Sequence, residues 1–357
     1  LAPLGIDRWA VTTDETVAAL YGGAVLDSLR SAGLSGQLLT FPAGEAHKTP
    51  ETWLSLCRQL AQEGFTRSDG LLALGGGVTG DMAGFVAACY QRGMALAQLP
   101  TTLLSQVDSA VGGKTAVDLP EGKNLLGAFY QPRLVIADPD CLTTLPRREL
   151  RCSMAEVIKY GFIQDAGLLD ALETDTPDWT AIIARCLTIK AALVAADERD
   201  TGARRLLNFG HTFGHAYEAA GGYAACTHGE AVAAGMAAML RWQLRRGDGV
   251  QAAYDRLLAL LERWELPCTM PFNTETVSRY LARDKKCEGD TLHAVLLRAT
   301  HCPGCGSCGR AATPSTAARP ARRCGFCCRW RWRWDAPDCI LPEHPGYWSG
   351  PCPRPIP

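Results

Sequence analysis

The chain has 357 residues, which suggests two domains at about 150 residues each. Its 36 lysines and arginines are balanced by 37 aspartates and glutamates, so no excess positive charge is available to gather nucleic acid or an anionic membrane surface. The sequence has no continuous apolar run of the ~18 residues that a membrane span needs, and residues 1–5 lack the basic start of a secretory signal. We therefore expect a cytoplasmic protein that binds neither nucleic acid nor membrane and holds any anion with a local cluster of cations.

The first 140 residues alternate short apolar segments with segments of helical periodicity. This alternation is typical of a parallel sheet built from βαβ units. Strands are predicted at residues 9–12, 37–41, 71–74, 96–99 and 134–137. From residue 147 onward the pattern changes, with few strand signals and long amphipathic or apolar segments. Helices are predicted at residues 149–162, 179–199, 212–220, 229–246 and 251–265.

A glycine-rich turn follows the predicted strand at residues 71–74. Gly75, Gly77 and Gly80 match G-x-G-x-x-G, and a helical segment follows, so backbone N–H groups are available for the diphosphate of a dinucleotide. A tight turn that binds no ligand gives the same pattern. The acid that usually binds the ribose is absent from its place about 20 residues on, because the next acid after Asp81 is Asp108. Asp14 and Glu15, after the first predicted strand, are the alternative partners for the adenosine end.

Eight basic residues lie beside glycine, asparagine or predicted helix ends rather than along a solvent-facing stripe. The loop formed by residues 112–115 (GGKT) combines backbone donors with the ammonium of Lys114, an arrangement suited to an anion. Asp108 supplies an acid among them. Although a single basic residue is usually solvated surface, the set indicates a substrate with more than one anionic group. The eight residues are Arg92, Lys114, Lys123, Lys159, Lys190, Arg204, Lys285 and Lys286.

The helical half carries a candidate metal site. His211 and His215 are four residues apart, which places them on one helix face, and His228 opens the next predicted helix. Glu156 lies on the helix at residues 149–162. Two imidazoles, one carboxylate and an open position are typical of a catalytic zinc site, although spacing alone does not decide which histidines are ligands.

The last 57 residues differ from the rest of the chain. They hold eight of the sixteen cysteines, eight arginines and no lysine, and have neither helical nor strand periodicity. Cys302, Cys305, Cys324 and Cys327 have the spacing of a zinc ribbon, and the Arg-Trp repeat at residues 329–334 suits stacking on nucleic acid. The preferred interpretation is a frameshifted segment, which predicts that residues 301–357 are disordered or loosely packed.

Taken in order, several of these motifs resemble those of the 3-dehydroquinate synthase family. The match runs from about residue 9 to residue 299. It covers residues 75–81 (GGGVTGD), 99–109 (LPTTLLSQVDS), 112–115 (GGKT), 122–124 (GKN), 155–161 (AEVIKYG), 207–215 (LNFGHTFGH), 228–230 (HGE) and 284–286 (DKK).

The resemblance implies an α/β N-terminal nucleotide-binding domain with a parallel sheet at residues 1–142, apparently without its first strands, followed by an all-helical metal-binding domain at 143–300. It implies an NAD- and metal-dependent carbon-oxygen lyase, with zinc or cobalt as the metal. Its expected reaction converts 3-deoxy-D-arabino-heptulosonate 7-phosphate, a phosphorylated sugar acid, to 3-dehydroquinate and phosphate in the shikimate pathway.

The resemblance also assigns roles by position. Glu156, His211 and His228 match metal ligands, so that His215 becomes either an outer neighbour of the ligands or a substrate-facing group rather than a ligand. Arg92 matches a residue contributed across a homodimer interface. Asp108, Lys114, Lys159, Asn208 and His215 match catalytic positions. Lys123, Asn124, Lys190, Arg204 and one of Lys285 or Lys286 match substrate-binding positions. Asp14, Glu45, Lys48, Gly75, Gly76, Gly77, Val78, Asp81, Thr101 and Thr102 match the NAD region.

Four alternatives stay open. Related sugar-phosphate cyclases that make 2-deoxy-scyllo-inosose or valiolone-type products share these motifs, as do metal-dependent polyol dehydrogenases. The chain can also be an inactive truncated homologue, because the closing helices expected after residue 298 are replaced by the unusual tail. A non-catalytic scaffold whose tail binds zinc or nucleic acid is a candidate from a different class.

Overall fold

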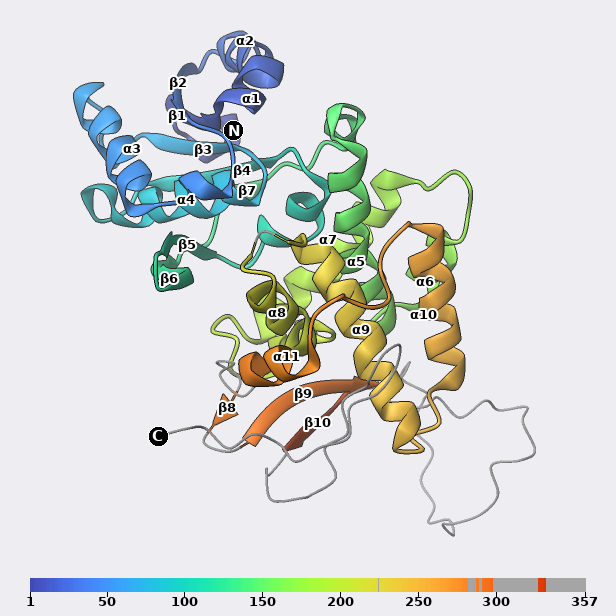
Figure 1. The fold of residues 1–357 in the computed structure, drawn as a ribbon. Helices are drawn as coiled ribbons and strands as arrows, with labels where there is room; N and C mark the ends of the chain where they lie inside the picture. Colours follow the sequence, from blue (N-terminus) through green and yellow to red (C-terminus); the bar gives the residue numbers. More distant parts are fainter. Residues whose placement is uncertain (224, 282–286, 289–290, 298–326, 332–357) are drawn as a thin grey trace, which may run out of the picture. The chain divides into compact units, whose positions relative to one another are not determined.

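The computed structural model describes residues 1–223, 225–281, 287–288, 291–297 and 327–331 (Figure 1). The chain divides into two compact units, one made of Leu1–Val157 and Thr176–Arg204, the other of Ile158–Asp175 and Arg205–Pro357. The domain limits at residues 142 and 300 stay predictions. Lys285, Lys286 and most of the unusual tail lie outside the described residues.

The first unit contains a five-stranded sheet with the strand order β2-β1-β3-β4-β7, and every pairing in it is parallel. This confirms the predicted parallel sheet. Gly75 at the end of β3 pairs with Pro100 at the end of β4, so the carboxyl ends of these neighbouring strands lie level with each other. The strands are β1 (Arg8–Asp14), β2 (Ser35–Phe41), β3 (Gly70–Gly75), β4 (Ala95–Pro100) and β7 (Leu134–Val135).

Helices cover both faces of this sheet because the buried strands are apolar on both sides. Leu71 and Ala73 of β3 pack in one core with α3 (Pro50–Gln62) and α4 (Gly77–Cys89). Leu72 and Leu74 point the other way and pack in a second core with α2 (Gly23–Ser31). Short elements η1 (Ala2–Leu4), α1 (Glu15–Val17), η2 (Ala18–Gly22), η3 (Glu45–His47) and η4 (Tyr90–Arg92) complete this part of the chain.

An antiparallel hairpin follows the sheet strands and was not predicted. It consists of β5 (Lys114–Leu119) and β6 (Gly122–Phe129), which pair from Lys114 opposite Phe129. The GGKT pattern at residues 112–115 predicts a loop, whereas Lys114 is the first residue of β5. The π-helical turn η5 (Ser105–Ser109) and the 3₁₀ segment η6 (Pro139–Thr144) lie before and after the hairpin in the chain.

Helix α7 (Trp179–Ala196) ends three residues earlier than predicted, because the backbone of Asp197 is not helical (φ −156°, ψ 78°). By length and composition α7 is the one helix in the described part of the chain that is apolar enough to cross a membrane. The sequence of α7 is not a continuous apolar run, because Arg185 and Lys190 interrupt it. Lys190 is buried in an ion pair with Asp108, which fits a core helix.

The second unit is mainly helical, as predicted. Helix α5 (Arg147–Ile163) begins in the first unit and ends in the second, and 3₁₀ segment η7 (Ala203–Asn208) also crosses the division. The unit's other helices are α6 (Ala166–Leu172), α8 (His211–Ala220), α9 (His228–Arg245), α10 (Gln251–Arg263) and α11 (Thr274–Leu281). Three strands at its end were not predicted: β9 (Thr291–Leu297) pairs antiparallel with β8 (Cys287–Glu288) and with β10 (Cys327–Arg331), which belongs to the unusual tail.

Helices α8 and α9 approach each other unusually closely. A Cβ on Gly235 of α9 would fall on the carbonyl oxygen of Gly210, the residue before α8, so only glycine fits at position 235. A Cβ on Gly214 would lie 3.3 Å from the backbone of Val232. This contact brings the start of α8 next to α9, and each of these helices begins with a histidine.

Candidate active site

The glycine turn lies between β3 and the start of α4, as the sequence predicts. Gly76 is the residue before α4 and makes no side-chain cap, so the first N–H groups of the helix are open to an anion. A Cβ on Gly76 would lie 3.0 Å from the methyl group of Thr102, and a Cβ on Gly77 would lie 3.2 Å from the Ser109 hydroxyl. Thr101 N–H donates to the Gly75 carbonyl at 3.0 Å. These contacts form a tight cradle around the turn, which fits a bound dinucleotide.

Three residues matched to the NAD and substrate sites form one hydrogen-bonded cluster around a buried lysine. Lys48 is 4% exposed, and its Nζ donates to Asp81 Oδ2 at 2.7 Å and to Asn124 Oδ1 at 2.6 Å. Burial lowers the pKa of Lys48, but the Asp81 carboxylate together with Glu45 and Asp118 outweighs it, so the net shift of the pKa is upward. Burial raises the pKa of Asp81, and the Lys48 ammonium offsets this only in part. Beside the cluster, Lys123 pairs with Glu45 at 3.0 Å.

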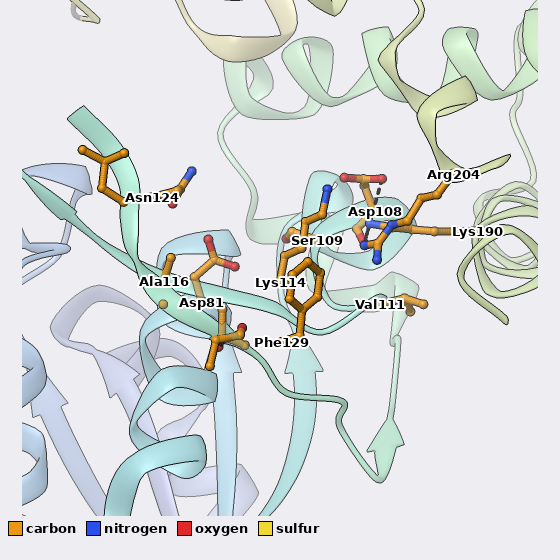
Figure 2. A pocket seen from close by; sticks show the side chains of 14 residues that line it. Asp81, Asp108, Ser109, Val111, Lys114, Ala116, Asn124, Phe129, Lys190 and Arg204 are labelled. Atoms are coloured by element: carbon orange, nitrogen blue, oxygen red, sulfur yellow. Dashed lines mark hydrogen bonds and ion pairs between the residues drawn. The ribbon is translucent and has the colours of Figure 1, made fainter. Parts of the chain in front are cut away.

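A cavity of about 450 Å³ opens beside this cluster in the first unit (Figure 2). Asp81 and Asn124 line it, together with Asp108, Lys114, Lys190 and Arg204. Lys190 is 4% exposed and pairs with Asp108 Oδ1 at 2.9 Å, the contact drawn as a dashed line in Figure 2. Six residues that the sequence analysis singled out separately therefore surround one cavity.

Arg204 is the least satisfied cation of this cavity. It is 3% exposed, and its Nη1 donates to the carbonyls of Glu198 at 2.9 Å and Gly112 at 3.0 Å. Its buried Nε has no hydrogen-bond partner among the described residues. Lys114, in contrast, is half-exposed and pairs with Asp200. A buried guanidinium with an unused donor at the cavity wall suits a carboxylate or a phosphate.

Glu156, His211 and His228 form a group that could hold a metal ion. Each offers one ligand atom, and these atoms lie within 4.8 Å of one another. Glu156 lies on α5 and is 1% exposed, whereas the two histidines are the first residues of α8 and α9. The capping box of Thr227 and Glu230 starts α9 at His228.

Each imidazole of the group also has a polar neighbour that orients it. His211 Nδ1 lies 3.2 Å from the Phe209 carbonyl oxygen, and His228 Nδ1 lies 3.4 Å from Glu218 Oε1. Such partners fix the orientation of the imidazole ring and leave its Nε2 available to a metal. Histidines that ligate metals usually have a partner of this kind on the other ring nitrogen. The donor set of two nitrogens and one carboxylate oxygen fits a divalent metal such as zinc.

The remaining predicted residues have varied surroundings. His215 is exposed and packs edge-on against His211, with ring centroids 5.4 Å apart. Lys159 on α5 is 1% exposed, and Asn208 ends η7. Arg92 is exposed with a left-handed backbone (φ 68°). Asp14 caps α1 by accepting the Val17 amide at 3.0 Å, and Val78 belongs to the first turn of α4.

Four neighbours of the site were missed. Glu218 was detectable, because it follows His211 and His215 at helical spacing on α8. Gly112 was seen only as part of a loop, whereas a Cβ there would fall on the Arg204 guanidinium. The role of Asp200 as the partner of Lys114 could not be predicted, because Asp200 directly follows a helix predicted to run to residue 199. Phe129 lines the cavity from β6, a strand that was not predicted.

The fold and the metal group define a class of protein. The chain resembles the solved structure of 2-epi-5-epi-valiolone synthase from Streptomyces hygroscopicus with NAD⁺ and Zn²⁺ bound, at a TM-score of 0.76 and 29% identity over 83% of this chain and 86% of that one. A solved 2-deoxy-scyllo-inosose synthase with carbaglucose-6-phosphate, NAD⁺ and Co²⁺ gives a TM-score of 0.72 at 28% identity, covering 82% of this chain and 83% of that one. The architecture is that of the sugar-phosphate cyclases.

The sequence comparisons identify the family within this class. The N-terminal model of 3-dehydroquinate synthase matches residues 38–152, and the C-terminal model matches residues 153–287. The 3-dehydroquinate synthase of Geobacter metallireducens is 48% identical over 303 residues, or 82% of this chain and 84% of the relative. That of Neisseria gonorrhoeae is 49% identical over 299 residues, or 81% and 83%. This chain belongs to the 3-dehydroquinate synthase family.

Proposed function

We propose that this chain converts 3-deoxy-D-arabino-heptulosonate 7-phosphate to 3-dehydroquinate and phosphate, a step of the shikimate pathway and aromatic amino acid biosynthesis. One observation carries the proposal: a chain 48% identical to a curated 3-dehydroquinate synthase brings Glu156, His211 and His228 into one metal-ligand group. A cavity lined by three cations supports a substrate with more than one anionic group.

The cofactors proposed for this reaction are NAD and a divalent metal, zinc first and cobalt as the alternative. Glu156, His211 and His228 would hold the metal. A bound metal would supply Lewis acidity toward a substrate hydroxyl, and bound NAD would supply reversible hydride transfer. NAD would be held by the glycine turn and its neighbours: Asp14, Glu45, Lys48, Gly75, Gly76, Gly77, Val78, Asp81, Thr101 and Thr102.

The cations of the cavity would bind the anionic ends of the substrate. Lys114, Lys190 and Arg204 can neutralise a carboxylate and a phosphate, and they can stabilise the charge that develops as phosphate leaves. Asp108, held by Lys190, would orient substrate hydroxyls, and the same contacts would keep a flexible sugar in one conformation. By family position we assign further substrate contacts to Arg92, Lys123, Asn124, Lys159, Asn208, His215 and one of Lys285 or Lys286.

We also propose that the protein acts as a homodimer in the cytoplasm, without nucleic acid or membrane partners. Size-exclusion chromatography with light scattering tests the dimer, since a monomer of full activity would contradict it.

A related cyclase activity is the second candidate. It is favoured by the likeness to the solved valiolone and inosose synthases, whereas the closer sequence relatives favour the dehydroquinate reaction. An inactive homologue is a third outcome of the same assay.

The test is phosphate release from the heptulosonate phosphate with NAD and zinc present. We expect turnover that disappears when zinc is removed by a chelator and returns when zinc is added. Glucose 6-phosphate is the matched control, because a carba-analogue of it is bound in the related inosose synthase. Release from glucose 6-phosphate alone would support the second candidate, and no release from either substrate would overturn both.

A further inference from the structure

A single side chain organises the turn that joins α7 to Arg204. Asp197 Oδ1 accepts the Thr201 amide at 3.0 Å and the Thr201 hydroxyl at 3.3 Å. Its Oδ2 accepts the Arg204 amide at 3.0 Å and also the Gly202 amide. One carboxylate thus satisfies three backbone N–H groups: those of Thr201 and Gly202, which precede η7, and that of Arg204 in the first turn of η7, where helical bonding has not yet begun.

The turn supplies Arg204 to the cavity wall and Asp200 to Lys114, another residue of that wall. Asp200, whose backbone is left-handed (φ 59°), pairs with Lys114 of β5. Arg204, at the end of the turn, places its Nη1 between the carbonyls of Glu198 and Gly112. Gly112 is itself left-handed (φ 106°) and leaves room for the guanidinium that a Cβ would displace. The position of both Arg204 and Lys114 therefore depends on the conformation of residues 197–204.

We propose that Asp197 is a positioning residue for the anion-binding wall of the cavity, acting through Arg204 and Asp200 without touching the substrate. This inference rests on the proposed function, because it takes the bound anion to be part of a phosphorylated sugar acid. The turn is held before the substrate arrives, so the entropy of ordering Arg204 is not lost on binding.

The chemistry of the side chain favours aspartate over its amide. Burial alone would raise the pKa of Asp197, but the backbone N–H donors from Thr201, Gly202 and Arg204 outweigh it and lower the pKa to about 2. The group therefore stays a carboxylate in neutral solution, with both oxygens accepting. An asparagine at this position has one carbonyl oxygen, so it cannot keep both sets of bonds.

Three variants test the proposal. Asp197→Ala removes all three amide contacts, and Asp197→Asn retains part of them. Asp178→Ala is the matched control, because Asp178 also accepts a backbone amide, that of Ala181 at 3.0 Å, but it caps the start of α7 and does not line the cavity. Each variant is measured by steady-state kinetics, by melting temperature, and by hydrogen–deuterium exchange of a peptide covering residues 197–204.

We expect Asp197→Ala to raise KM for the heptulosonate phosphate by about tenfold to about 100-fold, with a smaller fall in kcat. Amide exchange in residues 197–204 should become faster, and Asp197→Asn should fall between Asp197→Ala and the wild type in both measurements. Asp178→Ala should lower the melting temperature while KM stays within about twofold.

Two results would overturn the inference. One is an Asp197→Ala protein with the wild-type KM and unchanged exchange of the turn, and the other is an Asp178→Ala protein whose KM rises equally. Failure of the proposed function looks different, since the wild-type chain would then release no phosphate at all. In that case the amide exchange of residues 197–204 still tests the inference. Faster exchange in Asp197→Ala would show that this carboxylate holds the turn, and unchanged exchange would show that it does not.

Discussion

The histidines of the metal group and the cations of the cavity are positioned in different ways. His211 and His228 are first residues of two helices that pack together through glycines, so local helix signals decide where they lie. Lys190 also lies on a helix, but Lys114 lies on a hairpin strand and Arg204 at the end of a turn, and each of these two also contacts a residue distant in the sequence. A site built on helix starts can be predicted from helical signals in the sequence, whereas one built on a turn depends on side-chain bonds that those signals do not reveal.

The difference extends to how the charges are balanced. Of the three cations that line the cavity, Lys114 and Lys190 each pair with an aspartate, whereas Arg204 keeps a buried donor without a partner among the described residues. In the metal group two imidazoles and one carboxylate converge, a donor set that suits a divalent cation. The comparison predicts that changes in one region alter anion binding and changes in the other alter metal binding.

Removing a metal ligand should produce the largest effect. We expect His228→Ala and Glu156→Ala to lose bound zinc and to reduce phosphate release by about 1000-fold, because a metal contributes several kcal/mol to transition-state stabilisation. Metal analysis of the purified protein gives zinc per chain. His215→Ala is the matched control: it should keep its zinc, because His215 lies outside the group. Full zinc content in His228→Ala would contradict the assignment.

A change on the cavity side should leave the metal untouched. Gly112→Ala places a methyl group on the Arg204 guanidinium, so we expect KM to rise by about 100-fold while zinc per chain stays at the wild-type value. Gly64→Ala is the control, since it also has a left-handed backbone (φ 69°) but has open space around it. If Gly112→Ala lost zinc and Gly64→Ala did not, the two regions would not be independent.

The same contrast explains how much could be predicted from the sequence. Apolar strands, helical periodicity and the glycine turn predict the parallel sheet and most helices, and the T-x-x-E pattern at residues 227–230 indicates the helix that begins at His228. The hairpin at residues 114–129 was missed because Leu125, Leu126 and Phe129 are exposed, so apolar residues do not alternate cleanly with polar ones. The turn after α7 was missed because its bonds come from the Asp197 side chain, which helical periodicity does not reveal.

A neighbour of the metal group should have an intermediate effect. Glu218 lies 3.4 Å from His228 Nδ1, so Glu218→Gln weakens the orientation of that ring. We expect zinc affinity to fall by about 10-fold to 100-fold, with activity restored at high zinc. Competition with a fluorescent chelator measures the affinity. Glu262→Gln, on α10, is the control and should bind zinc like the wild type, whereas unchanged affinity in Glu218→Gln would remove this residue from the metal site.

The smallest effect on activity should come from a change that affects stability alone. Gln243 of α9 is 1% exposed, and its amide donates to the Leu297 carbonyl at 2.7 Å and accepts the Leu297 N–H at 3.0 Å, so it ties the end of β9 to the helix. Gln243→Ala leaves both backbone groups without this partner and should lower the free energy of unfolding by about 1–3 kcal/mol, as measured in urea. Gln251→Ala is the control: it removes only an exposed contact to Asp255 and should change the free energy of unfolding by less than about 0.5 kcal/mol. At 25 °C both variants should keep the wild-type KM and zinc content, because neither touches the cavity or the metal ligands. A Gln243→Ala protein that is fully stable but loses zinc would instead link β9 to the metal group.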